Sequence, residues 1–216
     1  MKQYKNKIKY NKTYFEIYAK KTLEYYYDKS WKNCFSVTEE KPDLQSDELD
    51  IGIEVTRVLQ KRDGKIDSIF NDYISKNIDF ERLENDINSL GGFVCKIGES
   101  TVMSHSKGLT DFQNNIDNLI YTIKKKTIEK LPNYKNFAKN MLYVFTSQAL
   151  YTEFDIKEAF TLLNQELCKI DLKFDLYFLN CFNKIYIINS VGNIIDILTL
   201  EENMLIIIKN EALNES

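Results

Sequence analysis

Proline, glycine and histidine are scarce in this 216-residue sequence, which contains two Pro, seven Gly and a single His. So few Pro and Gly residues leave little room for flexible linkers, and we expect one domain. The lone histidine, His105, stands in SHSKG, where nothing places a nucleophile beside it for hydrolase chemistry. A structural zinc site needs four Cys or His ligands in closely spaced pairs, which the sequence does not offer. We expect His105 to lie in a loop.

Long apolar runs and paired cysteines are also missing. Even MLIIIK is interrupted by charge well short of the roughly 20 residues that a membrane span requires. The four cysteines have no C-x-x-C spacing, and the start MKQYKNKIKYNK has no apolar stretch typical of a signal peptide. We therefore expect a reduced, cytoplasmic protein with no membrane partner. The absence of a P-loop and of G-x-G-x-x-G excludes nucleotide-binding enzymes of those types.

The net charge is small, since 29 basic and 32 acidic residues give a formal value of −3. This balance supplies no global reason to expect a nucleic-acid partner. The distribution is uneven, because residues 1–12 carry five Lys and no acid, and residues 120–140 carry six Lys and one Glu. Residues 33–54, in contrast, carry seven acids and one Lys. Either an acidic pocket lies beside basic flanks, or these runs are solvated faces.

With 44% apolar and 28% charged residues, the composition is typical of a folded globular protein. Hydrophobic periodicity predicts helices over residues 14–28, 66–77, 79–89, 111–131 and 155–168. It predicts strands over 34–37, 51–56, 93–97, 141–147, 174–180, 184–190 and 193–200. This alternation indicates an α/β fold, a mixed sheet flanked by helices with a C-terminal antiparallel β meander. We expect residues 1–216 to form a single domain, with a core over about 14–147 and an extension over about 155–209.

The segment KPDLQSDELDIGIEVTR, residues 41–57, carries the most chemical information. Strand alternation puts the apolar residues of 51–56 on one face and Gly52, Glu54 and Thr56 on the other. Burying a lone ionised Glu is costly unless a cation or a basic side chain neutralises it. Pro42 forces the preceding residue to be extended, so Asp43 should lie at the start or end of a neighbouring strand or in a bulge. If the two strands pair, Asp43 and Glu54 converge.

Two such carboxylates, together with a strand carbonyl and waters, are the hard oxygen ligands that Mg²⁺ accepts. A metal bound there can lower the pKa of a bound water and neutralise charge that grows on a phosphate. The alternative interpretation is purely structural. Asp43 would then be a turn residue bonded to its own backbone, and Glu54 would pair at the sheet edge with Arg57 or a lysine.

Pro42-Asp43, the eleven-residue step to Glu54, and the following Val55 and Thr56 resemble the PD-(D/E)XK nuclease superfamily, which has the restriction-endonuclease-like fold. An acid in the preceding helix, Glu16, is also similar to the first helix of that family. The resemblance covers roughly residues 14–57 and, by element order alone, continues to about residue 147. It implies that Asp43 and Glu54 hold Mg²⁺ or Mn²⁺, with help from Glu16 and the Val55 carbonyl. The family's water-orienting Lys, two positions after the Glu, is Thr56 in this sequence.

A lysine can instead come from the helix predicted over 111–131. At about 100° per residue, Lys124 flanks one edge of its apolar stripe, and Lys126 and Lys130 flank the other. If this helix packs beside the Glu54 strand, Lys126 or Lys130 can reach the pocket. Lysines that border an apolar stripe also commonly snorkel to solvent. Arg57 and Lys61 follow Glu54 and can contact phosphates of a bound strand, or be ordinary exposed counter-charges.

These features favour a Mg²⁺-dependent DNA endonuclease of the restriction or phage-defence kind. Asp43 and Glu54 would carry the metal, and Thr56 or Lys126 would position the attacking water. The alternative is a non-catalytic module of the same fold that binds a protein or a nucleic acid, which Thr56 and the acidic isoelectric point of about 5.4 favour. Nothing distinguishes ribose from deoxyribose, so RNA stays open as a substrate. Enzymes that cut both strands are commonly dimers, and a homodimer stays open as well, although the sequence reveals no interface.

Overall fold

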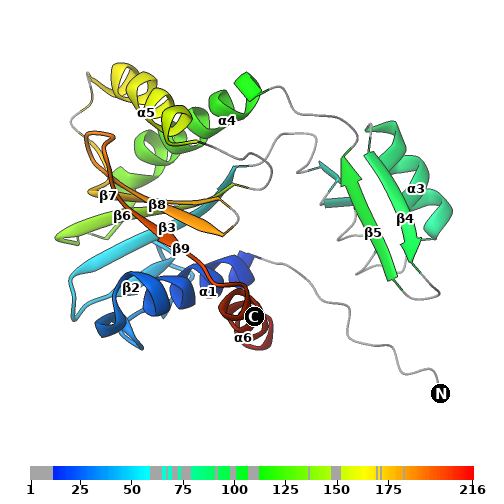
Figure 1. The fold of residues 1–216 in the computed structure, drawn as a ribbon, viewed down its shortest axis with the longest axis horizontal. Helices are drawn as coiled ribbons and strands as arrows, with labels where there is room; N and C mark the ends of the chain where they lie inside the picture. Colours follow the sequence, from blue (N-terminus) through cyan, green and yellow to red (C-terminus); the bar gives the residue numbers. More distant parts are fainter. Residues whose placement is uncertain are drawn as a thin grey trace. The chain divides into compact units, whose positions relative to one another are not determined.

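The computed structural model describes most of the chain (Figure 1). The described residues are 12–58, 65–66, 68–69, 73, 79–90, 92–97, 101–106, 112–135, 137–146, 152–168, 170, 172–181 and 183–216. They fall into two compact units. The larger unit consists of Tyr10–Val58 and Phe112–Ser216, and the smaller unit consists of Met1–Lys9 and Leu59–Asp111. The sequence analysis treated these units together as one domain.

A seven-stranded mixed sheet forms the centre of the larger unit (Figure 1). Its order is β1-β2-β3-β6-β7-β8-β9, in which the β3–β6 and β6–β7 pairs are parallel and the other pairs are antiparallel. The strands are β1 (Ser36–Val37), β2 (Leu44–Ser46), β3 (Ile51–Val58), β6 (Lys139–Thr146), β7 (Leu176–Cys181), β8 (Lys184–Asn189) and β9 (Ile194–Thr199). The prediction of an α/β fold with a mixed sheet is confirmed.

Helices cover both faces of this sheet (Figure 1). One face carries α4 and α5, and the other carries α1, against which α6 packs. These helices are α1 (Lys12–Thr22), α4 (Phe112–Lys125), α5 (Glu153–Leu167) and α6 (Glu202–Glu215). The helix α1 continues as the π-helical turn η1 (Leu23–Tyr27), which the short 3₁₀ turn η2 (Lys29–Trp31) follows. The helix α4 continues in the same way, through the π-helical turn η3 (Lys126–Lys130) and the 3₁₀ turn η4 (Leu131–Asn133).

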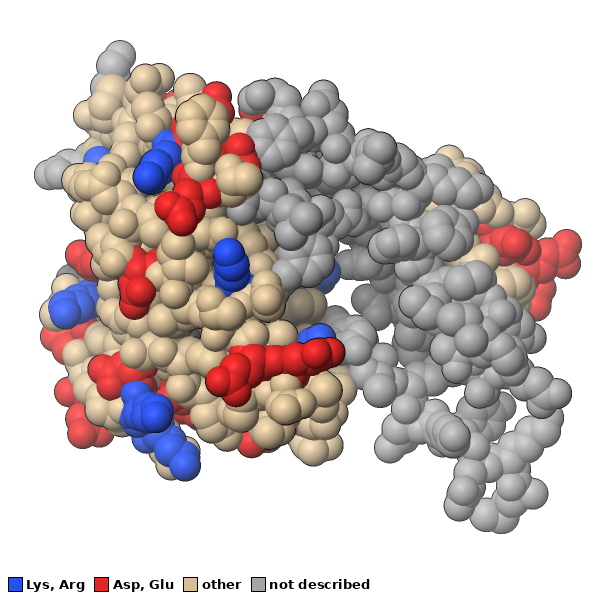
Figure 2. Space-filling model, in the orientation of Figure 1, with Lys and Arg blue, Asp and Glu red and all other residues tan. Residues whose placement is uncertain are grey.

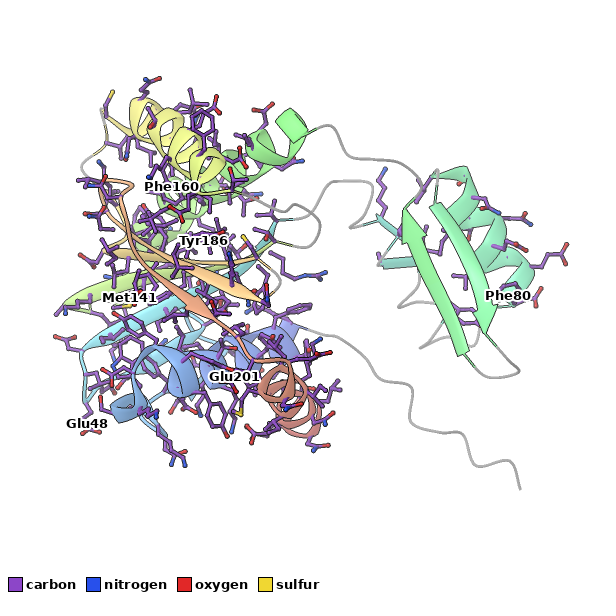
Figure 3. All side chains as sticks on the ribbon, in the orientation of Figure 1. Glu48, Phe80, Met141, Phe160, Tyr186 and Glu201 are labelled. Atoms are coloured by element: carbon purple, nitrogen blue, oxygen red, sulfur yellow. The ribbon has the colours of Figure 1, made fainter. Side chains whose placement is uncertain are left out.

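The two faces of β3 have the different environments that alternation predicts. Ile51, Ile53 and Val55 lie in the apolar cluster beneath α1. Val58 is four residues from Glu54 and so lies on the same face of β3. It belongs to the cluster beneath α4 and α5. That second cluster also contains Phe160 of α5 and Tyr186 of β8 (Figure 3). Glu54 therefore belongs to the face that α4 covers.

The smaller unit has its own apolar cluster, formed by Ile66, Leu83, Ile87 and Val94. Its described elements are α3 (Phe80–Ser89) and an antiparallel pair of strands, β4 (Gly92–Ile97) and β5 (Thr101–Ser106). His105 lies in β5, opposite Phe93, so the expectation that it lies in a loop was wrong. Pairing with β4 decides this strand, since TVMSHS has little apolar content of its own. Most of the helix predicted over 66–77 lies outside the described residues. The described residues of this stretch, 65–66, 68–69 and 73, are helical.

The sequence analysis did not predict α6, whose buried residues are only Ile208 and Ala212. Ile206 and Ile207 are 53% and 43% exposed, so the helix lacks the wide apolar stripe that periodicity detects. In the part of the chain that the structure describes, no helix has the length and apolar character needed to cross a membrane. Cys34, Cys168 and Cys181 are free thiols.

Candidate active site

Two buried carboxylates lie at the β2–β3 pair, one immediately before β2 and the other within β3. The antiparallel register pairs Leu44 with Ile53, so its continuation by one residue places Asp43 opposite Glu54. Asp43 Oδ2 also accepts a hydrogen bond of 2.9 Å from the backbone N–H of Val55. Asp43 and Glu54 are only 2% and 1% exposed. The expected pairing of the two strands is therefore present, and Asp43 lies at the start of β2, as Pro42 predicted.

Gly52 explains how the chain before Asp43 can lie so close to β3. A Cβ atom at Gly52 would come within 2.5 Å of Pro42 Cγ and 2.6 Å of Phe137 Cδ2. Such distances are far inside van der Waals contact, so a side chain at this position would push both residues away. The absence of a side chain thus lets the turn at Pro42 and the segment before β6 pack onto the face of β3 that carries Glu54.

Lys12 at the start of α1 bridges two of the predicted metal ligands. Its Nζ lies 2.7 Å from Asp43 Oδ1 and 2.8 Å from Glu16 Oε1. Burial opposes the charged ammonium, but hydrogen bonds to Asp43 and Glu16 outweigh it and raise the pKa of Lys12. Burial raises the pKa of Glu16, against the effect of Lys12, and the neighbouring Asp43 charge adds to the increase. Glu16 therefore lies beside Asp43, as the resemblance implied, with a lysine between them.

Lys126 reaches the site from the opposite side of the sheet. Its Nζ lies 2.5 Å from Glu54 Oε1, and its side chain is 23% exposed. The helix α4 packs against β3, which is the condition under which this contact was expected. Lys124, on the other edge of the helix, pairs instead with Glu166 of α5 at 2.6 Å. Helical geometry therefore predicted correctly which edge of the helix carries each of these two lysines.

Tyr134 is a further buried group of this region. Burial raises the pKa of its hydroxyl, and the charge of the nearby Glu54 carboxylate and a hydrogen bond to it raise that pKa further. The hydroxyl therefore stays protonated and remains a hydrogen-bond donor at neutral pH. Sequence reasoning missed Tyr134, which follows Leu131-Pro132-Asn133 without any pattern that links it to β3.

Three predicted site residues remain, Thr56, Arg57 and Lys61. Thr56 is partly buried on the same face of β3 as Glu54, two residues further along. Arg57 lies on the opposite face of β3, and its guanidinium carbon is 4.2 Å from the centroid of the Phe15 ring on α1. This arrangement is a cation–π contact, so Arg57 packs against a helix in this structure. Lys61 lies outside the described residues.

Basic side chains also gather near Glu54. The pKa of Lys41 is lowered by partial burial and by the neighbouring positive charges of Lys130 and Lys126, while Glu54 acts in the opposite sense. Lys41 is exposed, and its backbone carbonyl accepts a 3.3 Å hydrogen bond from the N–H of Lys135. The buried acids therefore have several lysines around them. On the face shown in Figure 2, the described acidic and basic side chains of the larger unit are intermingled.

The acids do not form a ready-made three-ligand site. Among the described residues, no group of three or more His, Cys, Asp or Glu side chains is placed to hold a metal ion. Glu16 and Asp43 share Lys12, and Glu54 has Lys126. Any divalent cation here would depend on two protein carboxylates, with waters and substrate oxygens completing its shell, which is how Mg²⁺ is commonly bound.

Comparisons with known proteins do not place this chain in a family. No protein-family model matches it, and neither does any curated protein or solved structure. The functional interpretation therefore depends on the geometry of the buried acids and the lysines around them.

Proposed function

We propose that this chain is a Mg²⁺-dependent endonuclease that hydrolyses phosphodiester bonds of DNA, of the restriction or phage-defence kind. One observation carries the proposal. Asp43, immediately before β2, and Glu54, in the paired strand β3, are both almost fully buried, and Lys126 reaches Glu54 from the turn that continues the covering helix. Burying two acids is costly, and a site that must attract a cation is a common reason to retain them.

The order of elements in the larger unit supports the resemblance to the PD-(D/E)XK superfamily. The larger unit runs α1, β1, β2, β3, α4, β6, with β6 parallel to β3. The Pro42-Asp43 pair precedes β2, and Glu54 lies in the middle of β3. The acidic residue of the first helix, Glu16, lies beside Asp43, as it should if the resemblance is real.

The residues present fit a divalent cation. The ammonium of Lys12 lies between two carboxylates, where it supplies the positive charge that these acids need. Lys126 bonds only Oε1 of Glu54, which leaves Oε2 of the carboxylate for the ion. Asp43 and Glu54 would hold the ion, which when bound acidifies a water and neutralises charge on the phosphate.

The chain's own groups suit the other tasks of phosphodiester hydrolysis. Lys126 can donate hydrogen bonds to a water beside Glu54, and so take the place of the lysine that Thr56 replaces. Lys41 and Lys130 offer positive charge for the phosphates of a bound strand. Glu54 and Asp43, held by β2 and β3, keep their positions because both strands belong to the central sheet.

A plasmid-nicking assay tests this proposal. The protein is incubated with supercoiled DNA and Mg²⁺ or Mn²⁺, and we expect conversion to nicked or linear forms. Asp43→Asn and Glu54→Gln should each abolish the activity. Cleavage by the two variants at the wild-type rate would identify a contaminant and remove the assignment. Parallel incubation with a labelled RNA shows whether ribose is accepted.

A second function has a specific observation in its favour. Both acids already have lysine partners in this structure, Lys12 on Asp43 and Lys126 on Glu54. A catalytically inactive module of the same fold, which binds a protein or nucleic acid, would need nothing more. Calorimetry with Mn²⁺ separates the two functions. Saturable binding that Glu54→Gln removes supports the enzyme, and no binding at millimolar metal supports the module.

A further inference from the structure

Two lysines near Glu54 lie against each other. The side chains of Lys41 and Lys130 are within hydrogen-bond reach of one another, and the charges of Lys126 and Glu54 also act on Lys41. Lys126 is already paired with Glu54 at 2.5 Å. Among the described residues, neither Lys41 nor Lys130 has a carboxylate within ion-pair distance. The two lysines therefore add positive charge that Glu54 does not compensate.

The backbone brings these two lysines together. Lys130 closes the π-helical turn η3, and the chain then turns through η4. Just beyond η4, the N–H of Lys135 donates a 3.3 Å hydrogen bond to the carbonyl of Lys41. The next residue, Pro42, packs on Gly52 of β3, where a Cβ atom would come within 2.5 Å of the proline ring. Contacts that do not depend on the lysine charges thus hold the two segments side by side.

An anion is the partner that this arrangement lacks. Two ammonium groups in contact repel each other, and a negative group placed between them removes the repulsion. Protein carboxylates serve this purpose for Lys12 and Lys124, but no described acid does so for Lys41 and Lys130. Lys41 is exposed, so an anion can arrive from solvent. Two positive charges match a phosphomonoester, which carries about −1.5 to −2 at neutral pH, better than the single charge of a phosphodiester.

We propose that Lys41 and Lys130 form a binding site for the terminal phosphate of a cut strand. Hydrolysis of a phosphodiester forms a P–O bond from water, breaks the P–O bond to the leaving sugar oxygen and transfers a proton to that oxygen. One strand end then carries a phosphomonoester, so the reaction adds negative charge beside Glu54, where the two lysines lie. Ammonium groups donate strong charge-assisted hydrogen bonds to phosphate oxygens. The inference rests on the proposed function for its nucleic-acid ligand, but the binding itself needs no divalent cation.

A binding experiment without metal tests the inference. Three nicked duplexes of one sequence carry a 5′-phosphate, a 3′-phosphate or only hydroxyl groups at the nick. Fluorescence anisotropy in the presence of EDTA measures the affinity of the full-length protein for each. We expect one of the phosphorylated duplexes to bind about tenfold more tightly than the hydroxyl duplex, the effect of hydrogen bonds to a charged group. The preferred duplex identifies which strand end keeps the phosphate.

Lys41→Met and Lys130→Met should each abolish this preference, because each removes one of the two cations. Neither variant should melt below the wild-type protein, since the substitution relieves a repulsion. Lys125→Met is the matched control, because Lys125 is an exposed lysine at the end of α4. It should weaken the binding of all three duplexes alike, through the lower overall charge, and keep the ratio between them.

The outcomes separate the inference from the proposed function. Equal affinity of the wild-type protein for the three duplexes would overturn the inference, and so would a preference that survives in both lysine variants. If both variants weaken all three duplexes equally, the lysines contact ordinary backbone phosphates, and the terminal-phosphate site is overturned as well. A preference that both variants lose, in a protein that does not nick plasmid DNA with Mg²⁺ or Mn²⁺, would support the site and remove the proposed function.

Discussion

Replacing Lys126 by methionine should destabilise the larger unit strongly, although Lys126 is a lysine on a helix near the surface. The substitution keeps the apolar stem and removes the ammonium, which leaves the Glu54 carboxylate buried without its ion-pair partner. Glu54 is only 1% exposed. Water cannot replace the lost charge easily at a position so deeply buried.

Removing one partner of a buried ion pair costs about 3–5 kcal/mol, because the other charge remains desolvated. Lys126 is 23% exposed on its side chain, so the pair has some contact with solvent and we expect the lower end of the range, about 3 kcal/mol. In a chain of this size each kcal/mol lowers the melting temperature by about 2–4 °C, which gives a decrease of about 6–12 °C.

Lys124→Met provides the matched control, two residues earlier on the same helix. The pair of Lys124 with Glu166 is exposed, with side chains that are 41% and 45% accessible to solvent. Exposed pairs contribute about 0–1 kcal/mol, so this variant should melt within a few degrees of the wild-type protein. Both variants are compared by calorimetry or circular dichroism at pH 7 and moderate salt.

The double substitution Lys126→Met with Glu54→Gln completes the test. It removes both charges, so most of the stability lost in Lys126→Met should return. If Lys126→Met and Lys124→Met lower the melting temperature equally, or if Glu54→Gln restores nothing, the reasoning about a buried carboxylate is refuted. Lys126 would then be a surface lysine like its neighbour.

Two further predictions concern positions next to the site and away from it. Gly52→Ala should cost about 1–3 kcal/mol, because its Cβ would overlap Pro42 and Phe137, and a drop in melting temperature of less than about 2 °C would contradict this close approach. Burial raises the pKa of the Cys181 thiol to about 11, so the stability that this thiol contributes should be complete below about pH 9 and be lost as pH rises through 11. Urea unfolding at pH 8 and pH 10.5 checks it, and Cys181→Ala, which lacks the titrating group, should lose less stability over that interval.

Local rules were sufficient for the residues that regular elements position. The period of two along 51–56 assigned Glu54 to the face opposite the α1 cluster, and Pro42 placed Asp43 beside it. The period of 3.6 assigned Lys124 and Lys126 to different edges of α4. Each of these side chains lies on the face that its own strand or helix sets, so the local sequence is enough to predict its position.

Long-range packing decides the parts that could not be predicted. Lys12 reaches Asp43 because α1 docks beneath the sheet, and the distance of 31 positions between the two residues leaves no local pattern. Tyr134 depends on the turn that η3 and η4 make after α4, where the helix leaves ordinary geometry. The pattern of 92–97 predicted a strand, but no strand pattern states which sheet the strand joins, and β4 pairs with β5 in the smaller unit.

The two lysines of the site differ in a way that bears on how an ion could enter. Lys12 has a side chain that is 69% exposed, while that of Lys126 is 23% exposed. Displacing either ammonium uncovers a buried carboxylate, because Asp43 and Glu16 beside Lys12 are 2% and 4% exposed and Glu54 beside Lys126 is 1% exposed. The two lysines differ instead in how far their own side chains are already in solvent. Under the proposed function we therefore expect a divalent cation to displace the more exposed Lys12 before Lys126.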